Sequence, residues 1–350
     1  MALEFGIFDH MEREPGVPLD RMLEERLVFL TEAERLGFWA YHLSEHHNVP
    51  LCLTPSQNVF FAAAAQRTSR ILLGGLVYLL PFYHPIRLIE EICVVDHLSG
   101  GRLQLGVGRG ISGEEHAFWG LPPDEAHARF EEALAVLLAG LTRETLSFDG
   151  AFYRFLDVPM ELTPKQRPHP PFWYAGNVEY AARHGMHFIG ANGIRRMPEV
   201  VAKYRALYDE ARARGAVVNG HVAEPRIGSA RHLYLADTDA EAEATARAAW
   251  TTYHLNYAKR GAPPPVAGPS FGGDFDVARK TEAVVVGSPD TVRAYVQRYA
   301  DQSGSNYFVG AFQWGDLTAA QQLHSMQLFA TEVMPRVRAA HPGGAALAVG

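Results

Sequence analysis

The sequence has few of the features that mark secreted, membrane-spanning or metal-clustering proteins. Its 350 residues include two cysteines, Cys52 and Cys93, which sit in apolar surroundings without the spacing of a redox or zinc motif. Reduced, unreactive thiols are therefore expected. No stretch approaches the roughly 20 apolar residues of a membrane span. The N-terminus, MALEFGIFDHMERE, carries acidic residues where a signal peptide would be basic. These absences predict a cytoplasmic protein with no membrane partner.

Positive charge is also scarce. The chain has 32 Lys and Arg against 39 Asp and Glu, a formal net charge of -7. This balance argues against a nucleic acid as partner, so any anionic ligand must be held by local cationic groups. Apolar residues are plentiful by contrast, at 47% of the chain, which is enough for a large buried core.

Short apolar runs alternate with amphipathic helical patterns along most of the chain. Eight runs are predicted to be strands: 3–8, 38–43, 71–80, 102–108, 171–176, 186–191, 230–236 and 305–312. Helices are predicted around 23–33, at 56–67, 85–98 and 126–141, and near 179–183, 199–214, 240–257 and 319–337. The strands are apolar throughout, as expected when both faces of a parallel sheet are buried.

Successive strand–helix units imply parallel strands joined by right-handed crossovers. An open doubly wound sheet and a closed barrel both satisfy this pattern, and the count of eight favours a (β/α)₈ TIM barrel. We therefore predict one α/β domain over 1–340 with two insertions and a flexible tail at 341–350. The first insertion, near 144–155, is predicted to be a hairpin. The second, at 261–283, is rich in proline and glycine and is predicted to be a mobile lid.

Two motifs at predicted strand ends match the sequence patterns of known binding sites, but the segments around them do not fit those sites. GRGISG (108–113) fits GxGxxG, but the segment after it is too short and proline-broken to be a dinucleotide-binding helix. Arg109 in this glycine-flanked turn still suits a phosphate.

His42 to His46 fits the HxxEH pattern of inverted zinc peptidases, which requires both histidines on one helical face. Here the segment follows a strand pattern and ends at Pro50, so no metal site is expected.

The adjacent histidines His46 and His47 follow the second predicted strand, where barrel enzymes place their active sites. Imidazole titrates near neutral pH, so either ring could transfer a proton. The alternative is that one of them only packs or forms a hydrogen bond under the barrel rim. The residues alone leave both interpretations open.

The order and spacing of several segments resemble the bacterial luciferase-like monooxygenases over roughly residues 3 to 337. The matching segments are AERLGFWAYHLSEHH, RTSRILLGGLVYLLPFYHPIRLIEE, DHLSGGRLQLGVGRG, GSPDTVRAYVQRY and LFATEVMPRV. The resemblance implies a (β/α)₈ barrel that uses reduced FMN and O₂ and inserts one oxygen atom through a flavin C4a-peroxide. It also implies a homodimer, formed through helices such as 85–98.

The resemblance assigns roles to individual positions. His46 matches the family's catalytic histidine, and Arg109 matches the arginine that binds the flavin phosphate. The backbone amides of Gly176 and Asn177 are expected to reach the same phosphate. Leu76-Val77 corresponds to a pair often joined by a non-proline cis peptide bond beneath the isoalloxazine ring.

Departures from the family pattern refine the expected function. Gly108 stands where luciferase has a cysteine, and Leu76-Val77 is bulkier than the alanines found there, so light emission is not implied. SEHH, in place of the SDH-type motif of deazaflavin-using relatives, favours FMN.

We therefore predict a two-component monooxygenase that takes FMNH₂ from a separate NAD(P)H:flavin reductase. Phe8, Phe82 and Trp314 at strand ends suggest a small, apolar organic substrate. Two alternatives stay open: a deazaflavin-dependent hydride-transfer oxidoreductase and a non-catalytic flavin-binding or partner subunit.

Overall fold

Eight parallel strands close into a barrel in the computed structural model, which describes residues 3–258 and 273–341. The barrel strands are β1 (Glu4–Asp9), β2 (Ala40–Leu43), β3 (Leu72–Leu79), β4 (Leu103–Gly108), β7 (Phe172–Ala175), β8 (His187–Gly190), β9 (Ile227–Leu235) and β11 (Tyr307–Ala311). Neighbours follow the order β9-β11-β1-β2-β3-β4-β7-β8, and β8 pairs back onto β9 to close the ring. The predicted TIM barrel is confirmed.

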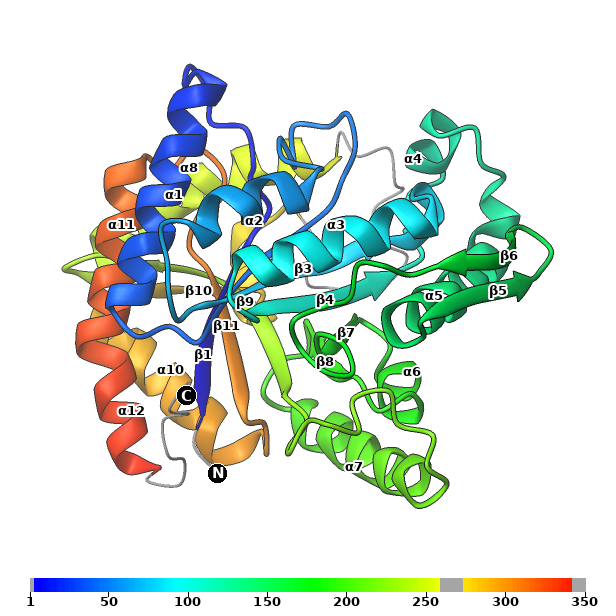
Figure 1. Ribbon diagram of the computed structural model, residues 1–350. Coiled ribbons are helices and arrows are strands. Elements are labelled where there is room, and N and C mark those ends of the chain that lie inside the picture. The colour runs from blue at the N-terminus through cyan, green and yellow to red at the C-terminus, as the bar shows by residue number, and fades with distance from the viewer. Residues whose placement is uncertain (1–2, 259–272, 342–350) are drawn as a thin grey trace.

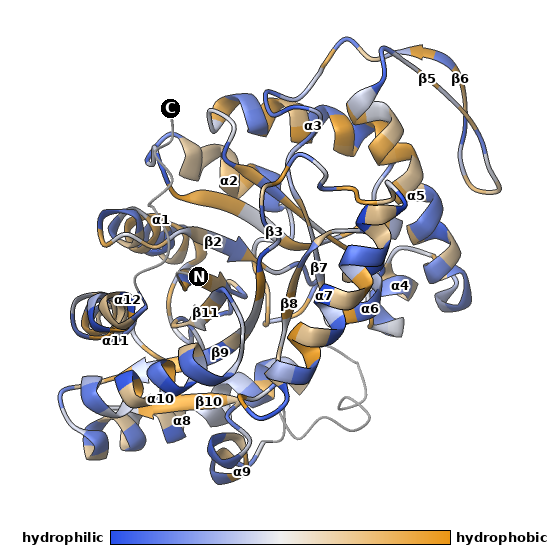
Figure 2. Cartoon of the chain, turned by 90° about the horizontal axis from the view of Figure 1, so that it is seen from below, coloured by the Kyte–Doolittle hydropathy of each residue, from blue (hydrophilic) through white to orange (hydrophobic). Residues whose placement is uncertain are grey.

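Helices surround the ring of strands (Figures 1 and 2). They are α1 (Leu19–Arg35), α2 (Gln57–Ala65), α3 (Pro85–Leu98), α4 (Gly113–Phe118), α5 (Ala126–Thr142), α6 (Val178–Arg183), α7 (Met197–Ala213), α8 (Asp239–Ala258), α9 (Phe275–Lys280), α10 (Pro289–Gln302), α11 (Ala319–Leu328) and α12 (Met334–Ala340). A π-helical turn, Phe329–Val333, joins α11 to α12. Within the described ranges, no helix combines the length and the apolar run needed to span a membrane.

Alternation of side chains along the strands separates an outer core from an inner one, and a further apolar cluster packs α8 and α9 against the ends of β9 and β10. Outward-facing residues such as Phe5 and Ile7 of β1 pack against the helices in the largest apolar cluster. Inward-facing residues such as Trp173, Tyr307 and Val309 form a smaller cluster inside the barrel. Side chains therefore fill the interior of the barrel, and catalytic groups are expected at the C-terminal ends of the strands.

The insertions match the predictions in part. Strands β5 (Thr145–Asp149) and β6 (Arg154–Pro159) form the predicted antiparallel hairpin, which extends away from the barrel in Figure 2. Most of the predicted lid, 261–283, lies outside the described residues, as does the predicted tail beyond 341. The described C-terminal part of the predicted lid segment contains α9. The strand β10 (Val284–Gly287), which was not predicted, pairs in parallel with the second half of β9.

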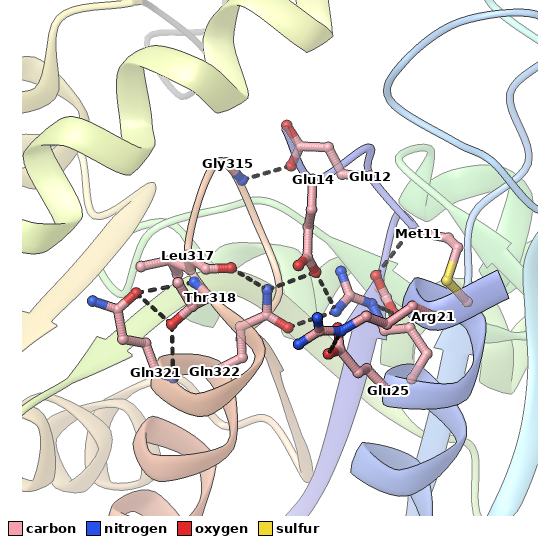
Figure 3. Close-up of polar contacts among 12 residues, drawn as sticks. Met11, Glu12, Glu14, Arg21, Glu25, Gly315, Leu317, Thr318, Gln321 and Gln322 are labelled. Atoms are coloured by element: carbon pink, nitrogen blue, oxygen red, sulfur yellow. Dashed lines mark hydrogen bonds and ion pairs between the residues drawn. The ribbon is translucent and has the colours of Figure 1, made fainter. Parts of the chain in front are cut away.

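A buried ionic network ties the loop after β1 to the helices (Figure 3). Arg26 of α1 lies 3.0 Å from Asp9 and 2.8 Å from Glu14. Gln322 of α11 accepts a hydrogen bond from Arg26 and donates one to Glu14. In the same loop, Glu12 accepts hydrogen bonds from Asn256 of α8 and from the amide of Gly315. These contacts hold α8 against the C-terminal end of the barrel.

Candidate active site

The residues predicted to form the site all lie at the C-terminal end of four neighbouring strands. His46 follows β2, the pair Leu76-Val77 lies in β3, Arg109 follows β4, and Gly176-Asn177 follows β7. These strands are consecutive in the barrel, so positions up to 131 residues apart in the sequence converge on one sector of its mouth. This is the end where (β/α)₈ enzymes place their catalytic groups.

The peptide bond between Leu76 and Val77 is cis, as expected. The pair forms an irregularity in the β3–β4 pairing, because Gly75 pairs with Leu105 and Tyr78 with Val107. Gly106 therefore faces this segment, and a Cβ atom there would lie 2.3 Å from the carbonyl oxygen of Gly75. A Cβ atom on Gly108 would lie 2.5 Å from Cγ2 of Val77. Glycine at both positions lets β4 approach the cis segment closely.

Gln57, the first residue of α2, supports this segment and was missed by the sequence reasoning. It is fully buried, and its amide nitrogen lies 2.9 Å from the carbonyl oxygen of Leu43 and 3.4 Å from that of Val77. It therefore links the end of β2 to the cis segment of β3. A glutamine on the buried side of an otherwise apolar helix was the available signal, because such a group needs a partner.

His46 is paired with a buried carboxylate. Its Nδ1 atom lies 3.2 Å from Oε1 of Glu115 in α4, and this oxygen also accepts a hydrogen bond of 2.9 Å from the backbone N–H of His47. Glu115 is 1% exposed. Burial raises the pKa of this carboxyl, but the hydrogen bonds and positive charge of the two histidines outweigh that effect and hold the pKa below its usual value. Glu115 is therefore ionised at neutral pH and acts as an acceptor for His46.

His47 has a different environment. Its Nε2 atom lies 2.9 Å from Oε1 of Glu45, whose second oxygen accepts hydrogen bonds from the Tyr83 hydroxyl and the Leu79 amide. Burial raises the pKa of Glu45. His47 therefore packs and forms a hydrogen bond beneath the rim. His46, whose side chain is 13% exposed, is the member of the pair that borders the mouth.

The HxxEH pattern does not form a shared site. His42 points into the barrel from β2, where its Nε2 atom lies 2.8 Å from the Tyr307 hydroxyl. Burial lowers the pKa of His42 to about 3, so this ring is neutral. His46 lies in the loop beyond the strand and contacts Glu115. The two imidazoles therefore do not converge on one ion.

Arg109 and Gly176 directly follow the adjacent strands β4 and β7. Val107 pairs with Tyr174, and two residues further in the same register are Arg109 and Gly176. Arg109 is exposed, and within the described part of the chain its guanidinium makes no hydrogen bond or ion pair. The Nε2 atom of His116 lies 3.2 Å from the Arg109 carbonyl oxygen and supports the turn. A free guanidinium in a supported, glycine-flanked turn suits a phosphate.

The turn after β7 begins a short helix. Gly176 has φ of +83°, and its amide donates to the carbonyl of Ile189, while the amide of Asn177 donates to that of Ala175. The Asn177 side chain caps α6 by accepting from the amide of Tyr180. Both amides predicted for phosphate binding thus already have protein acceptors. The first-turn amides of Val178 and Glu179 have no partner within the helix.

A hollow of about 190 Å³ lies beside this turn, and Gly176, Val178, Asn192, Arg196 and Lys203 are among its lining residues. A second hollow of about 190 Å³ lies at the opposite, N-terminal end of the barrel, next to Pro225 and Asn306. Of these two, the first adjoins the convergent residues, and its lining carries both charge signs, since Glu199 lies beside Arg196 and Lys203 is paired with Glu179.

Comparison with known proteins finds relatives along nearly the whole chain. The family described as luciferase-like monooxygenase matches residues 3–306. The protein y4wF of Sinorhizobium fredii is 35% identical over 96% of this chain and 97% of its own length. Limonene 1,2-monooxygenase of Rhodococcus erythropolis is 28% identical over 95% of this chain and 86% of its own. The oxygenase component of the flavin-dependent trigonelline monooxygenase of Acinetobacter baylyi is 27% identical over 70% and 68%.

Solved structures share the architecture. Monooxygenase RslO1 from Streptomyces bottropensis is 27% identical, with a TM-score of 0.83 over 95% of this chain and 99% of its own. The oxygenating constituent of 3,6-diketocamphane monooxygenase from Pseudomonas putida, solved with FMN, has a TM-score of 0.76 at 20% identity over 96% and 99%. The coenzyme F420-dependent tetrahydromethanopterin reductase of Methanopyrus kandleri has a TM-score of 0.68 at 18% identity over 96% and 100%. At these identities, the last two show the fold alone.

Proposed function

The chain belongs to the luciferase-like monooxygenase family, and from this membership we propose that it is the oxygenase component of a two-component flavin-dependent monooxygenase. It uses reduced FMN and O₂ to oxygenate a small organic substrate with a largely apolar skeleton. A separate NAD(P)H:flavin reductase supplies the FMNH₂. The relatives named as limonene 1,2-monooxygenase and as the oxygenase component of a flavin-dependent monooxygenase support this assignment.

One arrangement carries the proposal: a cis segment packed closely against two glycines, beside an arginine that is unpaired among the described residues. The cis segment Leu76-Val77 faces Gly106 and Gly108, and Arg109 stands at the end of the same strand. A flat isoalloxazine ring with a phosphate tail fits such a platform with an adjacent cation. When bound, FMN would supply the redox chemistry and the activation of O₂, while the protein orients it and excludes water.

The roles of the surrounding residues follow from their contacts. Arg109 would hold the phosphate of the bound cofactor, helped by the first-turn amides of α6 after Gly176-Asn177. Gln57 holds the Val77 carbonyl and keeps the platform in place.

His46 is the proton-transferring group, and Glu115 positions it. A neutral ring that donates from Nδ1 to a carboxylate leaves Nε2 unprotonated, so His46 accepts a proton at Nε2 and can return it. Because Glu115 stays ionised, the Nδ1 proton keeps its acceptor through this cycle.

A homodimer through the face formed by α2 and α3 is part of the proposal. Val59 of α2 is 73% exposed, and Val94 and Leu98 of α3 are 48% and 46% exposed. Apolar side chains gathered on neighbouring helices are typical of a surface that another subunit covers. Light scattering is expected to give twice the chain mass, and Val59→Glu is expected to shift it toward the monomer. A monomeric native chain would contradict this assignment.

The choice of cofactor is tested by parallel fluorescence titrations with FMN and with coenzyme F420. FMN is expected to bind at least about tenfold more tightly, a difference of roughly 1.4 kcal/mol. Tighter binding of F420 would support the hydride-transfer alternative instead. A protein that binds FMN but oxidises no compound of a broad panel would fit the non-catalytic alternative.

A further inference from the structure

Two polar side chains near the C-terminal ends of β9 and β11 have buried atoms without a hydrogen-bond partner among the described residues. Across the described residues, both amide atoms of Gln313 and the Nε2 atom of His232 are buried without a hydrogen bond. Gln313 is 1% exposed and His232 is 8% exposed. Buried polar groups in folded proteins nearly always have partners, so these atoms mark a place where another molecule completes the hydrogen bonding.

The strand register puts both side chains on the inner wall of the barrel. Ala311 of β11 pairs with His232 of β9. The next residue, Phe312, turns outward and packs against Phe329 in the helical layer. Because side chains alternate along an extended chain, Gln313 returns to the inner face, diagonally above His232. We call this pair the polar wall.

The polar wall lies across the barrel from the proposed flavin platform. In the ring of eight strands, β9 and β11 are diametrically opposite β3 and β4. His10, after β1, spans the space between the wall and His46, since its ring centroid lies 5.9 Å from that of His46 and 6.5 Å from that of His232. The His10 ring therefore links His46 to the polar wall, on the side of the barrel mouth opposite the proposed flavin platform.

The chemistry of the wall is uncharged and aromatic. Burial lowers the pKa of His232 to about 3, so the ring is neutral at physiological pH. The Gln313 amide offers both a donor and an acceptor. A carboxylate or an ammonium group would lose its hydration here without gaining a counter-charge. The rings of Tyr253, Trp250 and Trp314 surround His232 at centroid distances of 4.4, 5.4 and 5.7 Å, a lining that suits a flat ring.

We propose that Gln313 and His232 bind an uncharged hydrogen-bonding group of the carboxamide or lactam class, carried on a flat ring of the organic substrate. This inference rests on the proposed function, because it takes the bound group to belong to the molecule that is oxygenated. The inference narrows the substrate class to apolar ring compounds that also bear an uncharged group able to donate and accept hydrogen bonds.

Three probes of nearly equal shape test the polar wall: benzamide, benzoate and isopropenylbenzene. They present a neutral amide, an anion and a hydrocarbon on the same ring. Dissociation constants are measured by ligand-observed NMR on the full chain, with and without oxidised FMN. Benzamide is expected to bind about tenfold more tightly than the other two, and Gln313→Met is expected to reduce this advantage to less than about threefold. Equal affinities, undetectable benzamide binding, or an advantage that survives Gln313→Met would overturn the proposal.

Gln322 supplies the matched control. It is equally buried, but its amide is fully engaged with Arg26, Glu14 and Leu317. Gln322→Met is therefore expected to lower the melting temperature and to leave the probe preference unchanged. Gln313→Met is expected not to lower the melting temperature, because the amide it removes makes no hydrogen bond in the protein. A comparable fall in both variants would assign Gln313 a structural role and overturn the proposal.

A second variant and a measurement without FMN distinguish the possible outcomes. If Gln313→Met does not fold, Gln313→Glu replaces it. That variant introduces a charge at the wall and is expected to abolish the preference for benzamide, and a preference that persists would overturn the proposal. Failure of FMN to bind would contradict the proposed function, whereas the benzamide preference measured without FMN would still decide the polar wall.

Discussion

The Nδ1 atom of His46 lies 3.2 Å from Oε1 of Glu115, across 69 residues of sequence. The contact joins the loop after β2 to the short helix α4, which begins a few residues after Arg109. The carboxylate also holds the backbone of His47, so it fixes both the ring and the peptide that carries it. The contact thereby ties His46, the proposed proton-transferring group, to the segment that also carries Arg109.

Glu115→Gln is expected to disturb the tautomer of His46, because an amide can donate to Nδ1 where the carboxylate only accepts. ¹⁵N NMR of the labelled protein reads this change directly. Turnover is expected to fall roughly tenfold to a hundredfold, part of what a positioned acid–base group contributes. Glu114→Gln, at the exposed neighbouring position, is the control and should change neither quantity. An unaltered ¹⁵N spectrum in Glu115→Gln would contradict the positioning role.

Arg109→Ala is expected to weaken FMN binding about tenfold to a hundredfold, because charge-assisted hydrogen bonds to the phosphate are lost. Riboflavin, which lacks the phosphate, is the matched ligand, and its affinity should not change. Calorimetry with both ligands on both proteins makes the comparison. Equal losses of affinity for FMN and for riboflavin would show that Arg109 does not bind the phosphate.

Gly108→Ala is expected to reduce FMN affinity severalfold, because the added Cβ would lie 2.5 Å from Cγ2 of Val77 and displace the platform. Val77→Ala in the same chain should restore part of the affinity, which a double-mutant cycle measures. Gly113→Ala is the control, since its nearest atom, Cγ of Pro123, would be 4.0 Å away. Additive effects of the two substitutions would show that the contact does not shape the site.

Stability is expected to depend on pH through Glu12. Burial raises the pKa of this carboxyl from 4.5 to about 7, against the opposing effect of hydrogen bonds from Gly315 and Asn256. Because the folded-state pKa is the higher one, the contribution to stability is complete below the unfolded value and is lost as the pH rises through about 7.

The free energy of unfolding should therefore fall by up to about 3 kcal/mol from this group between about pH 4.5 and about pH 7. Glu12→Gln, which carries no charge, should flatten that part of the profile in denaturant titrations. If the free energy of unfolding depended on pH in the same way in the native protein and in Glu12→Gln, Glu12 would not be the cause of the pH dependence.

The barrel could be predicted from the sequence because each strand–helix unit carries its own local pattern. Helix α3 begins and ends where the pattern indicated, at Pro85 and Leu98. Strand β10, three valines and a glycine, was not predicted because its short run directly follows the proline- and glycine-rich segment that was assigned to an insertion. Helix α10 does carry a helical stripe, buried at Val292, Tyr295, Val296 and Tyr299, although its segment contributed only to the family resemblance.

The site was predicted less completely, for a physical reason. His46 and Arg109 stand in recognisable motifs, whereas Glu115 and Gln57 contact partners that are distant in sequence. The place of Gln313 follows only from the strand register. Glu115 acts across 69 residues, and no periodicity or spacing records such a pairing. Only the closed ring of strands brings these groups together.

Oxygen-isotope labelling tests the central claim most directly. The purified chain is supplied with FMN, a separate flavin reductase, NADH and ¹⁸O₂, and a panel of ring compounds with and without an amide group is analysed by mass spectrometry. The account predicts a product that carries one ¹⁸O atom, formed only when the chain, FMN and the reductase are all present. Reduction of O₂ to hydrogen peroxide with no labelled product across the whole panel would contradict it.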